Sequence, residues 1–160
     1  MKSKVKIFFI LLILLLMDIT KPFGYALSVD FLLLGIIFIS LNKKISTALF
    51  FSLIFGYMRS TLIIEADFLT MARYPLISLV SHYLLSYFNT AGKEKYTALV
   101  KNFIALAAII IYIGIDLIQA KVFLPSLALT SLLQSSFIYI FMSYLLKKCN
   151  YLILSGAAAQ

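Results

Sequence analysis

Six long apolar stretches constrain this chain more than any other feature of its sequence. A membrane-spanning helix needs about 20 residues, so 160 residues leave room for about six spans joined by short loops. Apolar residues make up 63% of the chain and charged residues 12%, and a soluble domain of this size cannot bury so large an apolar fraction. The sequence therefore predicts an integral membrane protein.

We expect an all-α, polytopic protein whose residues 1–154 form a single six-helix transmembrane domain, followed by a tail at 155–160. The runs are too long for strands and lack the alternation of an outer-membrane barrel. The alternative for the first run is a signal peptide cleaved after Gly24-Tyr25-Ala26, although Asp18 and Lys21 are unusual before a cleavage site. The expected spans cover about residues 5–20, 27–41, 45–64, 69–88, 98–118 and 123–146.

Charged residues predict the orientation, because cytoplasmic loops of membrane proteins carry an excess of Lys and Arg. With the N-terminus in the cytoplasm, five acids fall on the outer side, namely Asp18, Asp30, Glu65, Asp67 and Asp116. Both termini are then cytoplasmic, and the net charge of +8 reflects topology rather than nucleic-acid binding. Ten of the 14 basic residues fall inside: Lys2, Lys4, Lys6, Lys43, Lys44, Lys93, Lys95, Lys101, Lys147 and Lys148.

Arg59 is the clearest candidate for a functional residue, because charges inside a bilayer are costly and tend to be paired or functional. It lies 14 residues into the third run, about 21 Å along a helix, in the outer half of the membrane. The guanidinium either reaches outward to the interface or pairs with a carboxylate of a neighbouring helix. Asp30 is the best-matched partner by depth, and Asp18 is the next.

Small residues on the third run provide a candidate contact face. Ser52, Gly56 and Ser60 recur every four residues, a spacing that lets two helix backbones approach closely. The face either packs within the chain or binds another membrane protein. As a hypothesis, we assign partner binding to Asp30, Ser52, Gly56, Arg59 and Ser60.

A second candidate site is a polar cavity open to the outside between the fourth, fifth and sixth runs. Its expected lining residues are His82, Tyr112, Asp116 and Gln134. His82 alone is better explained by a hydrogen bond between helices than by a proton relay, and one histidine is a poor metal site. Tyr74, near the outer end of its run, is expected to be an interfacial anchor.

The sequence contains no pattern that predicts catalysis, a cofactor or a metal. Phosphate-binding, serine-hydrolase and zinc-protease motifs are absent. Glu65 and Asp67 are close in sequence but fall in an expected loop, where carboxylates are usually solvated. An intramembrane enzyme would need two reactive groups at a common depth, so we expect no enzymatic activity.

The stretch from Ser28 to Phe88 resembles the rod shape-determining protein MreD family, over about 60 of the 160 residues. Asp30 matches the aspartate of that family's P-D motif, although Val29 replaces the proline. Gly56 matches a family glycine near the end of the third span, whereas Arg59 stands where the family usually has an acid. The resemblance implies six spans, cytoplasmic termini and residence in the bacterial cytoplasmic (inner) membrane.

That resemblance also implies a function, which is a non-enzymatic scaffold of the cell-elongation machinery that supports rod shape and cell-wall biogenesis. Its partners would be the bitopic shape protein MreC and peptidoglycan synthases, gripped within the lipid bilayer. The alternative is the substrate-binding (S) component of an energy-coupling-factor vitamin transporter, which would use the outward polar cavity for a small-molecule ligand. The first run lacks the small residues that such components use for docking, which favours the scaffold.

Overall fold

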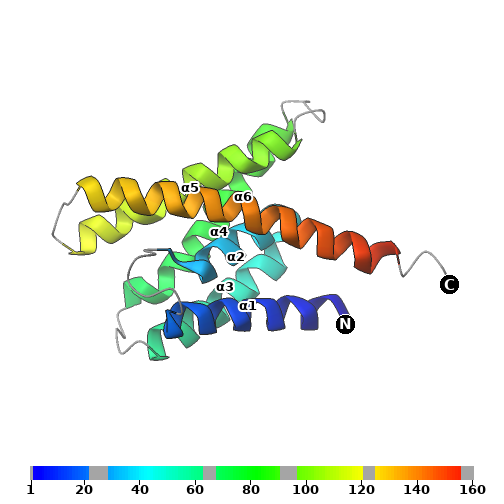
Figure 1. Cartoon of the computed structure of the whole chain (residues 1–160), viewed down its shortest axis with the longest axis horizontal. Helices are drawn as coiled ribbons and strands as arrows, with labels where there is room; N and C mark the ends of the chain where they lie inside the picture. The colour runs from blue at the N-terminus through cyan, green and yellow to red at the C-terminus, as the bar shows by residue number, and fades with distance from the viewer. Residues whose placement is uncertain (1, 22–28, 63–67, 91–96, 121–124, 156–160) are drawn as a thin grey trace.

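The computed structural model describes residues 2–21, 29–62, 68–90, 97–120 and 125–155, which form six α-helices and no strand (Figure 1). The prediction of an all-α chain is confirmed for this part of the molecule. The helices are α1 (Lys2–Thr20), α2 (Phe31–Asn42), α3 (Ile45–Leu62), α4 (Phe68–Thr90), α5 (Thr97–Ala120) and α6 (Pro125–Ser155).

Three of these helices contain a segment that is long and apolar enough to cross a membrane, judged by length and composition. The segments are Ile45–Leu62 in α3, Leu99–Leu117 in α5 and Ala128–Leu145 in α6. Helix α2 is also apolar but has only 12 residues and is therefore about 18 Å long. It is too short to cross a hydrocarbon core of about 30 Å alone.

Helix α2 is the centre of the bundle, since it contacts α1, α3, α4, α5 and α6. Ten of its 12 residues are buried, which explains why its sequence is apolar on every side. The helix starts four residues later than expected because Asp30 acts as its N-cap, and the Asp30 Oδ1 accepts a hydrogen bond from the Leu33 amide at 2.8 Å. At the other end of the chain, α6 continues to Ser155, beyond the expected end at residue 146.

Two glycines allow close contacts between neighbouring helices. Gly35 of α2 faces α1, and a Cβ atom built there would lie 2.5 Å from the Leu14 side chain. Gly56 of α3 faces the backbone of α4, and a Cβ atom there would lie 2.9 Å from the Met71 carbonyl oxygen. Pro75 lies four residues after Met71 inside α4 and has no amide hydrogen for that carbonyl. The carbonyl that the proline leaves free is thus the one that α3 approaches.

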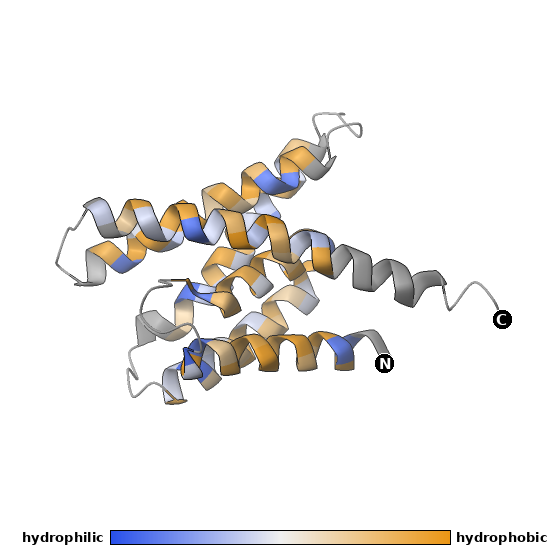
Figure 2. Cartoon of the chain, in the orientation of Figure 1, coloured by the Kyte–Doolittle hydropathy of each residue, from blue (hydrophilic) through white to orange (hydrophobic). Residues whose placement is uncertain are grey.

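Large apolar side chains cover the outside of the bundle. In Figure 2 the middle of α1 is hydrophobic and hydrophilic positions lie near both of its ends. Exposed side chains of this kind occur along α1, α3, α4, α5 and α6, for example Phe9, Phe50, Tyr83, Phe103 and Phe137. An apolar outer surface around a tightly packed interior is what a lipid environment requires.

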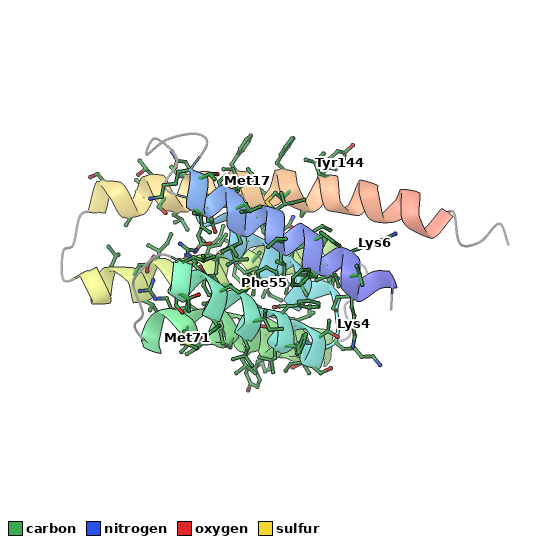
Figure 3. All side chains as sticks on the ribbon, turned by 90° about the horizontal axis from the view of Figure 1, so that it is seen from below. Lys4, Lys6, Met17, Phe55, Met71 and Tyr144 are labelled. Atoms are coloured by element: carbon green, nitrogen blue, oxygen red, sulfur yellow. The ribbon has the colours of Figure 1, made fainter. Side chains whose placement is uncertain are left out.

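The described charged residues lie toward the two ends of the bundle. Figure 3 places Lys4 and Lys6 at one end of α1 and Met17, the neighbour of Asp18, at the other, the end at which Met71 of α4 also lies. Lys101 Nζ donates to Asn42 Oδ1 at 2.9 Å, so the start of α5 lies beside the end of α2. Glu65, Asp67, Lys93, Lys95, Lys121 and the Gly24-Tyr25-Ala26 triplet lie outside the described residues, as do the side chains of Lys2, Lys147 and Lys148.

Candidate functional site

A cluster of five polar side chains forms around the N-terminus of α2, and we call it the Asp30 cluster. One carboxylate oxygen of Asp30, Oδ2, is its centre. This oxygen accepts hydrogen bonds from the Tyr74 hydroxyl at 2.8 Å and the Tyr112 hydroxyl at 2.6 Å, and it forms an ion pair with Arg59 Nη1. Arg59 Nη1 also donates to the Tyr74 hydroxyl oxygen. The members are Asp18, Asp30, Arg59, Tyr74 and Tyr112, from α1, the α2 cap, α3, α4 and α5.

Asp18 joins α1 to this cluster by capping α2 from outside. Its Oδ1 accepts a hydrogen bond from the Phe31 amide at 2.7 Å, and its Oδ2 accepts one from the Leu32 amide at 2.9 Å. The first amides of a helix have no partner within the helix and lie at the positive end of its dipole. A carboxylate is therefore well placed there. Arg59 Nη1 lies 3.4 Å from Asp18 Oδ2 and thus contacts both carboxylates.

The charged members of the Asp30 cluster are largely shielded from solvent. The side chains of Asp18, Asp30 and Arg59 are 2%, 9% and 20% exposed. Removing charges from water is costly unless each is paired and hydrogen-bonded, and here every carboxylate oxygen has a partner. The guanidinium carbon of Arg59 also lies 5.6 Å from the centre of the Tyr74 ring, within the range of a cation–π contact.

A second ion pair lies next to the cluster, between Arg73 of α4 and Asp116 of α5. Arg73 directly precedes Tyr74, and its guanidinium carbon lies 5.9 Å from the centre of the Tyr112 ring. Tyr112 therefore touches both ion pairs, one through its hydroxyl and the other through its ring. The second pair is more open, since the Asp116 side chain is 44% exposed.

The chemistry of the Asp30 cluster suits a structural brace, by which we mean a set of polar contacts that holds helices together. All four oxygens of Asp18 and Asp30 accept hydrogen bonds, three of them from the backbone of α2. A general base or nucleophile would have to present a reactive atom to a substrate, whereas these atoms hold helices together. Among the described residues, no group of three or more His, Cys, Asp or Glu side chains is placed to hold a metal ion.

The pairing alternative for Arg59 is confirmed, because the guanidinium contacts the two expected carboxylates. Asp30 is the closer partner and Asp18 the more distant one, in the order that depth along the helices predicted. The expectation that Tyr74 is an interfacial anchor is wrong. It is 1% exposed and belongs to the cluster, so it is a buried hydrogen-bonding residue rather than an interfacial anchor.

The small-residue face of α3, formed by Ser52, Gly56 and Ser60, is buried within the chain. Ser52 and Ser60 are buried, and Gly56 lies against Met71 and Tyr74 of α4. A partner protein that docked on this face would have to displace α4. The structure therefore shows the internal-packing alternative, and it gives Ser52, Gly56 and Ser60 no surface for the partner binding that we assigned to them.

The four residues expected to line one outward cavity lie in different places. His82 Nδ1 is 3.5 Å from the carbonyl oxygen of Ser40, near the C-terminal end of α2, which agrees with a histidine hydrogen-bonded between helices. Tyr112 binds Asp30 at the N-terminal end of α2, and ten residues of helix separate the two positions by about 15 Å. Asp116 lies near Tyr112 through Arg73, while Gln134 is half-buried on α6. His82 and Tyr112 therefore do not share a cavity.

Sequence reasoning missed Arg73 and Tyr74 as members of a polar site, and it assigned Asp116 to a cavity without finding its ion pair with Arg73. A usable signal was present, because Arg73 and Tyr74 lie about one and a half turns into their helix, at a depth similar to that of Arg59. Comparison of the chain with known protein families, curated proteins and solved structures finds no significant match.

Proposed function

We propose that this protein is a non-enzymatic, multi-pass membrane scaffold that binds partner membrane proteins within the bilayer. In this proposal all six helices belong to the membrane domain and both termini are cytoplasmic. The observation that carries the proposal is the use of the buried charges. Asp18, Asp30 and Arg59 join helices to one another through ion pairs and hydrogen bonds. These buried charged groups therefore stabilise a fixed arrangement of the helices.

The exterior supports the same proposal. The faces that remain for partners are the apolar outer surfaces of the helices, since the small-residue face of α3 is covered by α4. Short connections between the helices leave little aqueous surface on which a soluble partner could dock. Contacts with other transmembrane helices therefore fit the molecule better than contacts with soluble proteins.

We assign this scaffold to the cell-elongation machinery of a bacterial cytoplasmic membrane, with the bitopic shape protein MreC and peptidoglycan synthases as partners. The support is the resemblance of residues 28–88 to the MreD family, in which Asp30 and Gly56 keep the family residues. Asp30 and Gly56 are also the residues on which the packing of α2 and α3 depends. Arg59 differs from the family acid and is a partner of Asp30.

In-cell photo-crosslinking tests the scaffold. A photoreactive amino acid is placed at the exposed positions Phe103 and Phe137 and, as a matched control, at the fully buried Phe55. We expect a discrete adduct with another membrane protein, MreC among the candidates, from at least one exposed position and from none at Phe55. Adducts with lipid alone at every exposed position would contradict the proposal.

A further inference from the structure

A groove of about 220 Å³ runs between α5 and α6 and opens to the outside of the bundle. Its α5 wall includes Leu99, Asn102 and Phe103, and its α6 wall includes Ser136, Tyr139 and Ile140. Figure 1 shows why a groove forms, since the beginning of α5 and the end of α6 diverge and lie far apart. The walls are mostly apolar, which suits a site that faces lipid.

Two hydrogen-bonding groups in this groove have no partner in the described part of the chain. Tyr139 is 4% exposed, lines the groove and forms no hydrogen bond there through its hydroxyl, in contrast to Tyr74 and Tyr112. Asn102 lies on the opposite wall with its side chain exposed, and its amide also makes no hydrogen bond to a described residue. A tyrosine hydroxyl without a hydrogen bond in an apolar environment is unfavourable.

The combination of apolar walls and a hydroxyl without a partner among the described residues narrows the possible occupants. Tyr139 lies within Ala128–Leu145, the segment of α6 that is long and apolar enough to cross a membrane. Water or a lipid headgroup would hydrogen-bond to the hydroxyl but would not fill the apolar groove, and an acyl chain would fill the groove but has no hydrogen-bonding atom to offer. A neighbouring transmembrane helix offers both an apolar ridge to fill the groove and a polar side chain at the required depth.

We propose that the α5–α6 groove binds one transmembrane helix of a partner protein, and that a Ser, Thr, Asn or Gln side chain of that helix hydrogen-bonds to Tyr139. This inference rests on the proposed scaffold function and names the place where it acts. Asn102, on the opposite wall, provides a second hydrogen-bonding group closer to the start of α5. The exposed Phe103, in the α5 wall, and the exposed Phe137, next to Ser136 in the chain, extend the apolar contact.

A host–guest peptide tests the groove without a known partner. The probe is a donor-labelled oligo-leucine helix of about 20 residues with lysine flanks and one Asn at the depth of Tyr139. The full chain, labelled with an acceptor at its single cysteine, is reconstituted with it in phosphatidylcholine vesicles. The peptide is diluted until it shows no energy transfer with itself.

We expect energy transfer well above the random level for the Asn peptide and random transfer for the all-leucine peptide. Tyr139→Phe removes only the hydroxyl and should reduce the specific transfer at least fivefold, and Ser136→Leu should reduce it by filling the groove. Tyr144→Phe is the matched control, because Tyr144 lies on the same helix, is 64% exposed and points away from the bundle (Figure 3). This control should transfer energy as the unchanged protein does.

Three outcomes would overturn the inference. They are equal transfer to both peptides, an unchanged signal in Tyr139→Phe, and transfer between two populations of this chain that Tyr139→Phe abolishes, which would make a second copy the occupant. If the peptide fails while crosslinkers at exposed positions still trap a membrane protein, the scaffold stands and the groove is not its site. If both experiments fail, the scaffold itself is wrong.

Discussion

The two sides of this bundle are held together by different means. Around the N-terminus of α2, five elements meet through charged and aromatic side chains that bond to one another within the chain. Between α5 and α6 the contact is apolar, the helices diverge, and Tyr139 has no hydrogen-bond partner among the described residues. The first side uses its carboxylate oxygens and tyrosine hydroxyls within the chain, whereas the second offers surface and hydrogen-bonding capacity to another molecule.

For the membrane protein that we propose, this difference has a physical origin in the bilayer. Lipid tails are as apolar as leucine, so apolar surface alone gives helices little reason to associate with each other rather than with lipid. Polar contacts and close backbone packing then decide which helices stay together. The bundle uses both around α2 and neither extensively between α5 and α6. Substitutions on the two sides should therefore differ sharply in their effect on stability.

Removing the carboxylate of Asp30 should have the largest effect. Asp30→Ala leaves the more distant Asp18 as the one carboxylate of the cluster beside Arg59, removes the acceptor of two tyrosines and deletes the cap of α2. Breaking a buried ion pair by removing one partner costs about 3–5 kcal/mol. SDS-induced unfolding in detergent, followed by circular dichroism, measures the loss. Asp30→Asn keeps a capping side chain, so its stability should fall less. Equal stability of Asp30→Ala and the unchanged protein would show that the Asp30 cluster is not a brace.

A matched pair of phenylalanines compares the two sides directly. Phe55 of α3 is fully buried, while Phe137 of α6 is 74% exposed. In lipid the cavity term of a Phe→Ala change remains, and a cavity of about 100 Å³ costs about 2.4 kcal/mol. We therefore expect Phe55→Ala to lower the free energy of unfolding by about that amount and Phe137→Ala to leave it unchanged. A comparable loss in both variants would mean that α6 packs as tightly as the centre.

Gly56 tests the close approach of α3 to α4. Gly56→Ala places a methyl group against the Met71 carbonyl, which belongs to the backbone and cannot rotate away, so we expect a loss of about 1–3 kcal/mol. Gly114→Ala in α5 is the control, because nothing lies within 4 Å of its added Cβ. That change should be neutral or stabilising, since alanine favours helix by about 1 kcal/mol over glycine. Similar unfolding curves for the two variants would argue against tight α3–α4 contact.

The smallest effect is expected for the more open ion pair. Asp116→Asn breaks the contact with Arg73 where the carboxylate is nearly half exposed, and exposed pairs contribute about 0.2–1 kcal/mol. The loss should shrink further as salt is added during unfolding, because exposed charges are screened. A loss as large as that of Asp30→Ala would place Asp116 in the brace and remove the distinction between the two pairs.

Much of the architecture could be predicted from the sequence because it depends on local runs of residues. The six helices follow from apolar length, and the Arg59–Asp30 contact follows from counting depth along two helices. The start of α2 was misplaced because an apolar run does not show where a cap interrupts it. Only the position of Asp30 relative to Asp18 and Leu33 fixes that boundary.

The roles of Tyr74 and of the Ser52–Gly56–Ser60 face depend on rotation about the helix axis, which a single sequence specifies poorly. The hydrophobic pattern of a membrane helix is nearly uniform around its circumference, so it does not show which side faces α4. For the same reason four polar residues on three helices suggested one cavity, although His82 and Tyr112 lie near opposite ends of α2.

The shortness of α2 has a consequence for how the protein is made. Asp30 precedes Arg59 by 29 positions and Tyr112 by 82 positions in the chain, so this carboxylate is synthesised well before most of its partners. Until they arrive, a helix of 12 residues with an acidic cap is a poor substrate for insertion into lipid by itself. Helix α1, whose Asp18 satisfies the first amides of α2, precedes α2 in the chain and is already in place. In the proposed membrane topology, insertion of α2 is therefore a cooperative event that is completed only when α3, α4 and α5 emerge.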